Sequence, residues 1–269
     1  MTDHSAIHKN DSFVYRFGKM VMGAALLICT TASGQEKRLT KEQELLVNIN
    51  PGRITDEGLS LHSAAVQTGG AQYRFRFSRP ENFQQISFAA ETGIRMSGYS
   101  TELTGFRFSY TKGFRLGVNK TGKFRAYLGY QLSTEPLYIR TGASSSWVNF
   151  SSLSLHSEAN YLLGRMQLSF AFTVPVAGFV SRTAPDASAS GRFNGLLYDS
   201  YSNAWLTTWN EMHGLDFSLR FRGGRDSRVG WTTEAGFRYR SLDTDNDFQS
   251  RSFRLSGGLV WRFSKQVLR

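Results

Sequence analysis

Ten times after Gly34 an aromatic residue is followed directly by arginine. The pairs are Tyr73-Arg74, Phe75-Arg76, Phe106-Arg107, Phe114-Arg115, Phe124-Arg125, Phe221-Arg222, Phe237-Arg238, Tyr239-Arg240, Phe253-Arg254 and Trp261-Arg262. Because neighbouring side chains on a β-strand point to opposite faces of the sheet, each pair predicts a strand with one aromatic and one cationic face. What this chain can fold into therefore depends on whether lipid, water or a protein core meets each face.

The composition also favours strands. The chain of 269 residues has 21 Phe, 11 Tyr, 5 Trp and 26 Gly but only 5 Pro, which is typical of strands joined by tight turns. The net charge of +11 comes from arginines spread singly along alternating segments, so we expect no nucleic-acid partner. Cys29 is the only cysteine, and we expect neither a cofactor nor a thiolate metal site in the mature chain.

Residues 1–34 have the pattern of a signal peptide. Basic residues precede an apolar stretch from Met20 to Ile28, and small residues follow at positions 32–34. The apolar stretch is shorter than the about 20 residues that a spanning helix needs. We therefore predict export, with cleavage near Gly34, between Gly34 and Gln35.

A short helix is predicted directly after this leader. Thr40-Lys41-Glu42-Gln43 fits a capping box that opens a helix through Val47, and Pro51 and Gly52 would end it. We assign residues 35–57 to a periplasmic N-terminal segment that contains this helix.

From Leu59 onward the apolar residues recur at every second position, which predicts strands. The clearest run is Met166 to Val176. Strands are predicted near 59–67, 71–79, 84–97, 103–117, 123–133, 147–163, 166–180, 212–222, 228–241 and 250–263. Many of them match the roughly 9–11 residues that a tilted strand needs to cross a bilayer.

The predicted connections alternate in length along the second half of the chain. Short connections are predicted at 79–83, 118–122, 164–165 and 223–226, and long ones at 133–146, 181–211 and 242–249. Short turns on one side and long loops on the other, with an even strand number, are typical of membrane β-barrels.

The free-energy cost of a charge in lipid determines which face of the predicted strands meets the membrane. An arginine facing lipid at mid-bilayer costs about 2–4 kcal/mol, and roughly a dozen of them would exceed the stability of any fold. We therefore predict an all-β, transmembrane, antiparallel up-and-down β-barrel of about ten strands, with eight or twelve as alternatives, whose aromatics face lipid. A soluble periplasmic β-sandwich binding protein stays open as an alternative, because alternation alone does not exclude it.

At this level the chain resembles the small outer-membrane β-barrel superfamily of Gram-negative bacteria. The resemblance rests on the leader, on the alternation from Leu59 to Phe263, and on the closing strand Gly258-Leu259-Val260-Trp261-Arg262-Phe263. The six residues 264–269 that follow Phe263 depart from the usual aromatic-ended signal. The resemblance implies a barrel over residues 58–263, a tail over 264–269, an outer-membrane location, and as partners the barrel-assembly machinery, lipid and lipopolysaccharide.

The predicted lumen is rich in arginine. We expect the following to point inward: Arg74, Arg76, Arg95, Arg107, Arg115, Arg125, Arg220, Arg222, Arg238, Arg240, Arg254 and Arg262. The carboxylates that can be placed beside them are Glu91, Glu158, Asp216 and Glu234. This pattern fits a conduit or binding site for small anions, or a ladder of ion pairs that plugs a narrow barrel. If neutralising Arg107, Arg125 and Arg238 abolished the anion selectivity of a pore, these three arginines would mark its selectivity filter.

Two local patterns invite a catalytic interpretation. Glu211-Met212-His213 puts an acid and a histidine on one strand face, similar to one acid-x-His pair of the omptin proteases, but a second acidic pair is not found. His156 and Ser157 are strand neighbours, so they face opposite sides of the sheet. We therefore predict no catalytic residues and a protein that is not an enzyme. An omptin-like protease or a lipid hydrolase is the alternative, which an activity screen of a His213 variant would test.

Two loop segments carry candidate binding residues. Asp243, Asp245 and Asp247 alternate like the opening of a calcium loop, but the glycine expected next is replaced by Phe248, so we assign no metal. Aromatics within residues 181–211 suit recognition of an extracellular ligand, namely Phe193, Tyr198, Tyr201, Trp205 and Trp209. The predicted function is structural or surface-interacting, or a small anion-favouring pore.

Overall fold

The structure, a computed structural model, describes residues 40–57, 61–95, 101–119, 121–141, 144–182, 204–208, 211–224, 227–243 and 247–264. The predicted signal peptide, its cleavage site and residues 265–269 of the predicted tail lie outside these ranges. The described residues form strands and turns and contain no α-helix. A helix long and apolar enough to span a membrane is not found in them.

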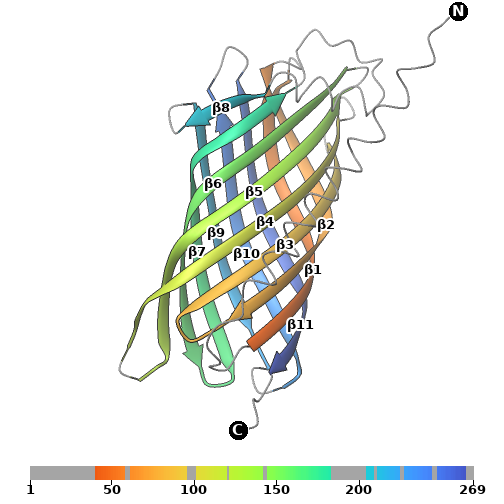
Figure 1. The fold of residues 1–269 in the computed structure, drawn as a ribbon. Helices are drawn as coiled ribbons and strands as arrows, with labels where there is room; N and C mark the ends of the chain where they lie inside the picture. Colours follow the sequence, from red (N-terminus) through yellow and green to blue (C-terminus); the bar gives the residue numbers. More distant parts are fainter. Residues whose placement is uncertain are drawn as a thin grey trace, which may run out of the picture. The chain divides into compact units, whose positions relative to one another are not determined.

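Eleven strands follow one another along the described chain. They are β1 (Thr40–Asp56), β2 (Leu61–Ser78), β3 (Asn82–Arg95), β4 (Thr101–Val118), β5 (Phe124–Thr141), β6 (Ser144–Leu163), β7 (Met166–Arg182), β8 (Trp205–Thr208), β9 (Met212–Arg222), β10 (Val229–Leu242) and β11 (Phe248–Ser264). Each pairs antiparallel with its neighbours, and β1 also pairs with β11, so the sheet closes on itself (Figure 1).

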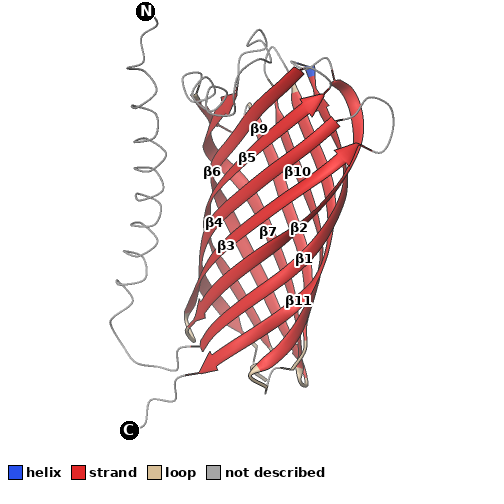
Figure 2. Cartoon of the chain, turned by 90° about the vertical axis from the view of Figure 1, so that its right-hand side faces the viewer, coloured by secondary structure: helices blue, strands red, loops and turns tan. Residues whose placement is uncertain are grey.

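The closed barrel is ten-stranded, because β8 and β9 occupy the same strand position in the wall. Residues 167–173 of β7 pair with β9, and residues 177–180 of the same strand pair with β8. These two short strands therefore act as one interrupted strand, and the prediction of an antiparallel barrel of about ten strands is confirmed. Closure leaves no free sheet edge in the wall, which a membrane-spanning sheet requires. Figure 2 shows the tilted strands wrapping around the barrel.

The predicted helix at Thr40–Val47 is wrong, because this segment is the first half of β1. The predicted periplasmic segment 35–57 therefore supplies a wall strand, and the barrel begins at Thr40 instead of residue 58. Inward Glu44, Leu46 and Asn48 alternate with outward Leu45, Val47 and Ile49. Backbone pairing with β2 on one side and β11 on the other outweighs the local capping signal. Pro51 and Gly52, the predicted helix stop, lie inside the same strand.

Two further predicted boundaries are wrong. The predicted strands 59–67 and 71–79 are the single strand β2, which runs through Gly69 and Gly70 without a turn. The predicted long loop 133–146 is strand almost throughout, because β5 continues to Thr141 and β6 begins at Ser144. The strand number agrees with the prediction because the split of β2 offsets the omission of β1.

The side chains are partitioned as predicted, with apolar residues outside and polar residues inside. Thirty large hydrophobic side chains of the described residues are exposed, among them Phe106 at 50% and Leu255 at 63%. Buried polar or charged side chains number 31, against 17 buried hydrophobic ones. A soluble protein does not expose so much apolar surface. The single closed layer and this distribution exclude the sandwich alternative.

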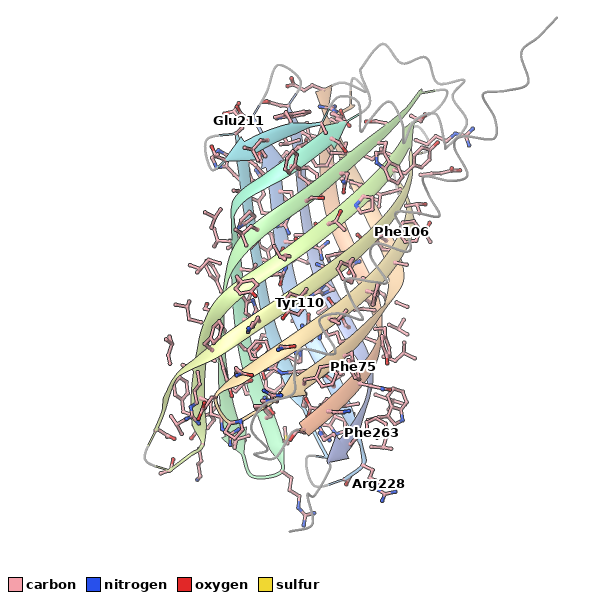
Figure 3. All side chains as sticks on the ribbon, in the orientation of Figure 1. Phe75, Phe106, Tyr110, Glu211, Arg228 and Phe263 are labelled. Atoms are coloured by element: carbon pink, nitrogen blue, oxygen red, sulfur yellow. The ribbon has the colours of Figure 1, made fainter. Side chains whose placement is uncertain are left out.

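The two ends of the barrel differ. At the turn end β2 ends at Ser78 and β3 begins at Asn82, and β6 ends at Leu163 and β7 begins at Met166. At the loop end β7 ends at Arg182 and β9 begins at Met212, with only the short strand β8 described between them. Figure 3 places Glu211 at the loop end, and Arg228 and Phe263 at the turn end. Most wall strands have 14 to 20 residues, more than the about 9–11 that a bilayer needs. The strands therefore extend beyond the membrane.

Candidate functional site

The lumen is crossed by ion pairs between strands that are not neighbours. Arg76 of β2 donates two hydrogen bonds to Glu158 of β6, at 2.9 and 2.8 Å, and three other strands separate β2 from β6 along the wall. The guanidinium of Arg76 also lies 3.8 Å from the ring centroid of Phe83. A Cβ on Gly113 would collide with that ring, so the close approach of β4 to Phe83 requires glycine. We call contacts of this kind cross-lumen ion pairs.

Glu234 of β10 is the centre of the densest group of charges. Its carboxylate accepts from Arg74 at 2.6 Å, from Arg220 at 2.9 Å and from Arg254. Arg74 lies on β2 and reaches a second carboxylate, Glu44 of β1, at 3.2 Å. All these side chains except that of Arg254 are less than a tenth exposed. Glu234 therefore offsets three guanidinium groups that are withdrawn from water.

A second group of charges lies nearer the loop end. Arg240 of β10 bonds Asp216 of β9 at 2.8 Å and Glu135 of β5 at 3.1 Å, the latter across the lumen. Arg238 lies 3.4 Å from Asp216 and 4.0 Å from Glu91 of β3. The lumen retains a small cavity of about 90 Å³ between these two groups and another of about 70 Å³ between the second group and apolar residues such as Phe150. Arg107 lines both cavities. We call the first of them the central cavity.

An apolar layer fills the lumen close to the loop end. It consists of buried Ile54, Ala64, Val66, Leu103, Ile139, Val148, Phe150, Val180, Met212, Leu242 and Phe248, drawn from every one of the strands except β3 and β8. The rings of Phe150 and Phe248 pack with centroids 5.4 Å apart. The ion pair between Arg182 of β7 and Asp56 of β1 spans the lumen at the same end. Such a layer excludes water from the section of the lumen that it fills.

The turn end holds a wider space, which we call the vestibule. Its volume is about 370 Å³, and its lining residues are Thr40, Glu42, Arg76, Ser78, Arg79, Arg125, Tyr127, Asn160, Leu162, Gln167, Arg222, Ser227, Arg228 and Arg262. Six of these are arginines and one is a carboxylate. Glu42 accepts from Arg222 at 3.2 Å and from Arg262 at 3.1 Å. The vestibule is therefore strongly cationic.

Most of the arginines that were predicted to face the lumen lie there. Ion pairs with carboxylates in the lumen are made by Arg74, Arg76, Arg220, Arg222, Arg238, Arg240, Arg254 and Arg262. Arg107 lines the central cavity and Arg125 the vestibule, and within the described part of the chain neither makes an ion pair. Arg115 is exposed near the turn end, beside a register shift. The side chain of Arg95 lies outside the described residues.

Half of the carboxylates that pair with arginines in the lumen, Arg182 included, were missed from the sequence. Glu42 and Glu44 were assigned to the helix, Glu135 to a loop, and Asp56 to the segment before the barrel. Arg182 was also left out of the predicted lumen. A signal for Glu42 and Glu44 was present, because each alternates with outward Gln43, Leu45 and Val47.

Of the two candidate catalytic pairs, Glu211 and His213 lie at the start of β9, and His156 and Ser157 point to opposite faces of the wall. Glu211 is an exposed turn residue, and the neighbour between the pair, Met212, points into the apolar layer. His213 therefore lies on the outward face of β9. His156 points inward, where its Nδ1 lies 2.9 Å from Thr173 Oγ1 and its Nε2 lies 3.8 Å from Glu158, while Ser157 points outward.

The two candidate loop sites are only partly described. Asp245 lies outside the described residues, and the part of the chain that the structure covers holds no group of three potential metal ligands. Of the predicted recognition aromatics, Trp205 is in β8 and packs half-buried against the apolar layer. Phe193, Tyr198, Tyr201 and Trp209 lie outside the described residues.

Comparison with known proteins shows a likeness in fold. Neither a protein-family model nor a curated protein matches the sequence. Among solved structures, the outer membrane protease OmpT from Escherichia coli has a TM-score of 0.50 at 11% identity, covering 87% of this chain and 99% of OmpT. OprG of Pseudomonas aeruginosa (TM-score 0.41, 10% identity, 86% and 98% covered) and Neisserial surface protein A (0.38, 13%, 82% and 97%) also match. The chain thus has the fold of an outer-membrane β-barrel.

Proposed function

We propose that this chain is an outer-membrane protein that crosses the bilayer as a closed, non-conducting barrel and acts through its two ends. The exposed aromatics and aliphatics supply the outer surface that lipid requires. Lys41 and Lys112 extend over the rings of Phe77 and Phe114, at 5.6 and 5.2 Å, so their stems cover apolar surface while the ammonium groups reach toward water. The predicted export leader supports the same location.

The cross-lumen ion pairs are the main observation that supports a closed lumen. Arginines at several levels are bonded to carboxylates on strands that are not their neighbours, and the apolar layer adds a section without charges. A ten-stranded barrel has an interior little wider than its side chains, so few such contacts are enough to fill it. The small volumes of the two inner cavities agree with this interpretation.

The role that follows is structural or surface-interacting. A rigid wall that extends past the membrane can present the loop end to lipopolysaccharide or to an extracellular ligand. We propose no catalytic activity, because His213 faces outward and is not accompanied by a second acidic pair among the described residues. Testing purified protein and its His213→Ala variant against peptide and lipid ester substrates would contradict this proposal if the native protein alone were active.

Planar-bilayer recording tests closure directly. We expect no discrete steps from the native protein, because the ion pairs and the apolar layer interrupt any water path. The Phe150→Ala, Phe248→Ala double variant removes two packed rings of the apolar layer but leaves the cross-lumen ion pairs in place, so it should also stay closed. Heat-modifiable migration in gels would show that both proteins are folded. Regular anion-selective steps from the native protein would overturn closure and restore the pore as the function.

A further inference from the structure

We infer that the vestibule is a binding site for the phosphate group of a small soluble anion, which enters from the turn end. The inference concerns a site that lies on one side of the closure, so it does not depend on whether the lumen conducts. Among the described residues, six arginines and one carboxylate, Glu42, line this space, and two of the six, Arg76 and Arg222, also pair with Glu158 and Glu44. The surrounding wall of low polarisability concentrates their field in the enclosed volume.

The two sides of the vestibule have different roles. On one side the carboxylate of Glu42 holds both Arg222 and Arg262, and Arg262 also donates to the backbone oxygen of Gly224 at 2.6 Å. These guanidinium groups are fixed before any ligand arrives, so little side-chain freedom is lost on binding. Arg262 retains donors that these contacts do not use.

Arg125 lies on the opposite side. Arg125 belongs to β5, and Arg262 belongs to β11. Four strands separate β5 from β11 in either direction around the ten-stranded wall. Arg125 has no ion pair within the described residues, although it lines the same space. A planar guanidinium with free donors matches the oxygens of a phosphate, which accept two parallel hydrogen bonds from it. A phosphate between Arg125 and Arg262 would bridge the two walls.

The floor of the vestibule separates this site from the rest of the lumen. Arg76, paired with Glu158 and stacked on Phe83, lies between the vestibule and the central cavity. The volume of about 370 Å³ exceeds what one phosphate fills and lies within the usual range of small-molecule sites, about 300–1,000 Å³. The ligand class is therefore an anion with two phosphates, or with one phosphate and a small organic group.

Calorimetric titration of the full chain in a nonionic maltoside detergent tests this site with pyrophosphate and inorganic phosphate as probes. We expect saturable binding of pyrophosphate, weaker binding of inorganic phosphate, and loss of affinity as sodium chloride is raised. Arg125→Gln removes an arginine without leaving a described carboxylate unpaired, so the barrel should still fold. It should weaken pyrophosphate binding at least about tenfold. Arg228→Gln, at the exposed rim, is a second variant that should weaken it less.

Arg107→Gln is the matched control. It removes the same charge from another lumen arginine that lacks an ion pair, but at the central cavity, and pyrophosphate binding should stay unchanged. An equal loss in Arg107→Gln and Arg125→Gln would show that only the net charge of the lumen matters and would overturn the site. The inference also fails if the native protein shows no saturable binding. Binding heat that appears only when phosphatidylglycerol is added to the micelles would show that the phosphate belongs to a lipid. This outcome would overturn the inference of a small soluble anion.

Discussion

The apolar layer and the vestibule lie in one lumen, yet they are built from opposite kinds of residue. Strand β5 carries both, since its inward side chains change from Arg125 at the turn end to Gln131 in the middle and Ile139 at the loop end. The same strand keeps its alternation between these positions, with Leu128, Tyr130 and Leu132 exposed on the outer face. The closure and the anion site that we propose are therefore separated along the barrel axis, while the outer surface stays apolar.

The largest expected effect concerns the charged section between these two regions. Glu234→Gln keeps the shape of the side chain but leaves Arg74, Arg220 and Arg254 without their shared carboxylate. Removing one partner of a buried ion pair costs about 3–5 kcal/mol, so the free energy of unfolding should fall by at least this much. Urea titration in lipid vesicles, followed by tryptophan fluorescence, measures it.

The control for that experiment is Glu102→Gln. Glu102 and Arg140 pair at 3.8 Å with both side chains more than half exposed, so the loss should stay within about 1 kcal/mol. If the two variants lost similar stability, the charged section would not be the buried region of paired charges that the structure shows.

Thiol labelling compares access to the vestibule with access to the central cavity. In a chain with Cys29 replaced by serine, Ser78→Cys lines the vestibule and Ser252→Cys lines the central cavity. A negatively charged methanethiosulfonate should react with the first about tenfold faster than a positively charged one, relative to free cysteine, because the arginines attract it. The second should react slowly with both. Equal rates at the two positions would mean that no barrier lies between them.

The smallest expected effect is in the apolar layer. Ile139→Val removes one methylene from a fully buried side chain, so the free energy of unfolding should fall by about 0.5–1.5 kcal/mol. Bilayer recording should still show a closed barrel, since the neighbouring side chains remain. A leak at this single substitution would indicate that the layer closes the lumen with far less margin than its eleven residues suggest.

The wall was more predictable from the sequence than the lumen. Alternation identified the outward faces of Met166–Val176 and of the strand around Phe217, because each strand carries its own periodic signal. The partner of each arginine is decided by strands far apart in sequence, such as Arg76 and Glu158, and no local pattern encodes that pairing. Glu42 and Glu44 show how a local rule misleads, since a capping-box sequence was taken for a helix although the same residues also alternate.

The separation of partners along the chain has a consequence for how the barrel assembles. Glu42 is in the first strand, and Arg262, 220 residues later, is in the last, so their contact cannot form until β11 has reached β1. The same event joins the final row of backbone hydrogen bonds and neutralises charges that were still hydrated in the open sheet. Complementary charges on the two terminal strands thus favour the correct register of β1 against β11 only when the barrel closes.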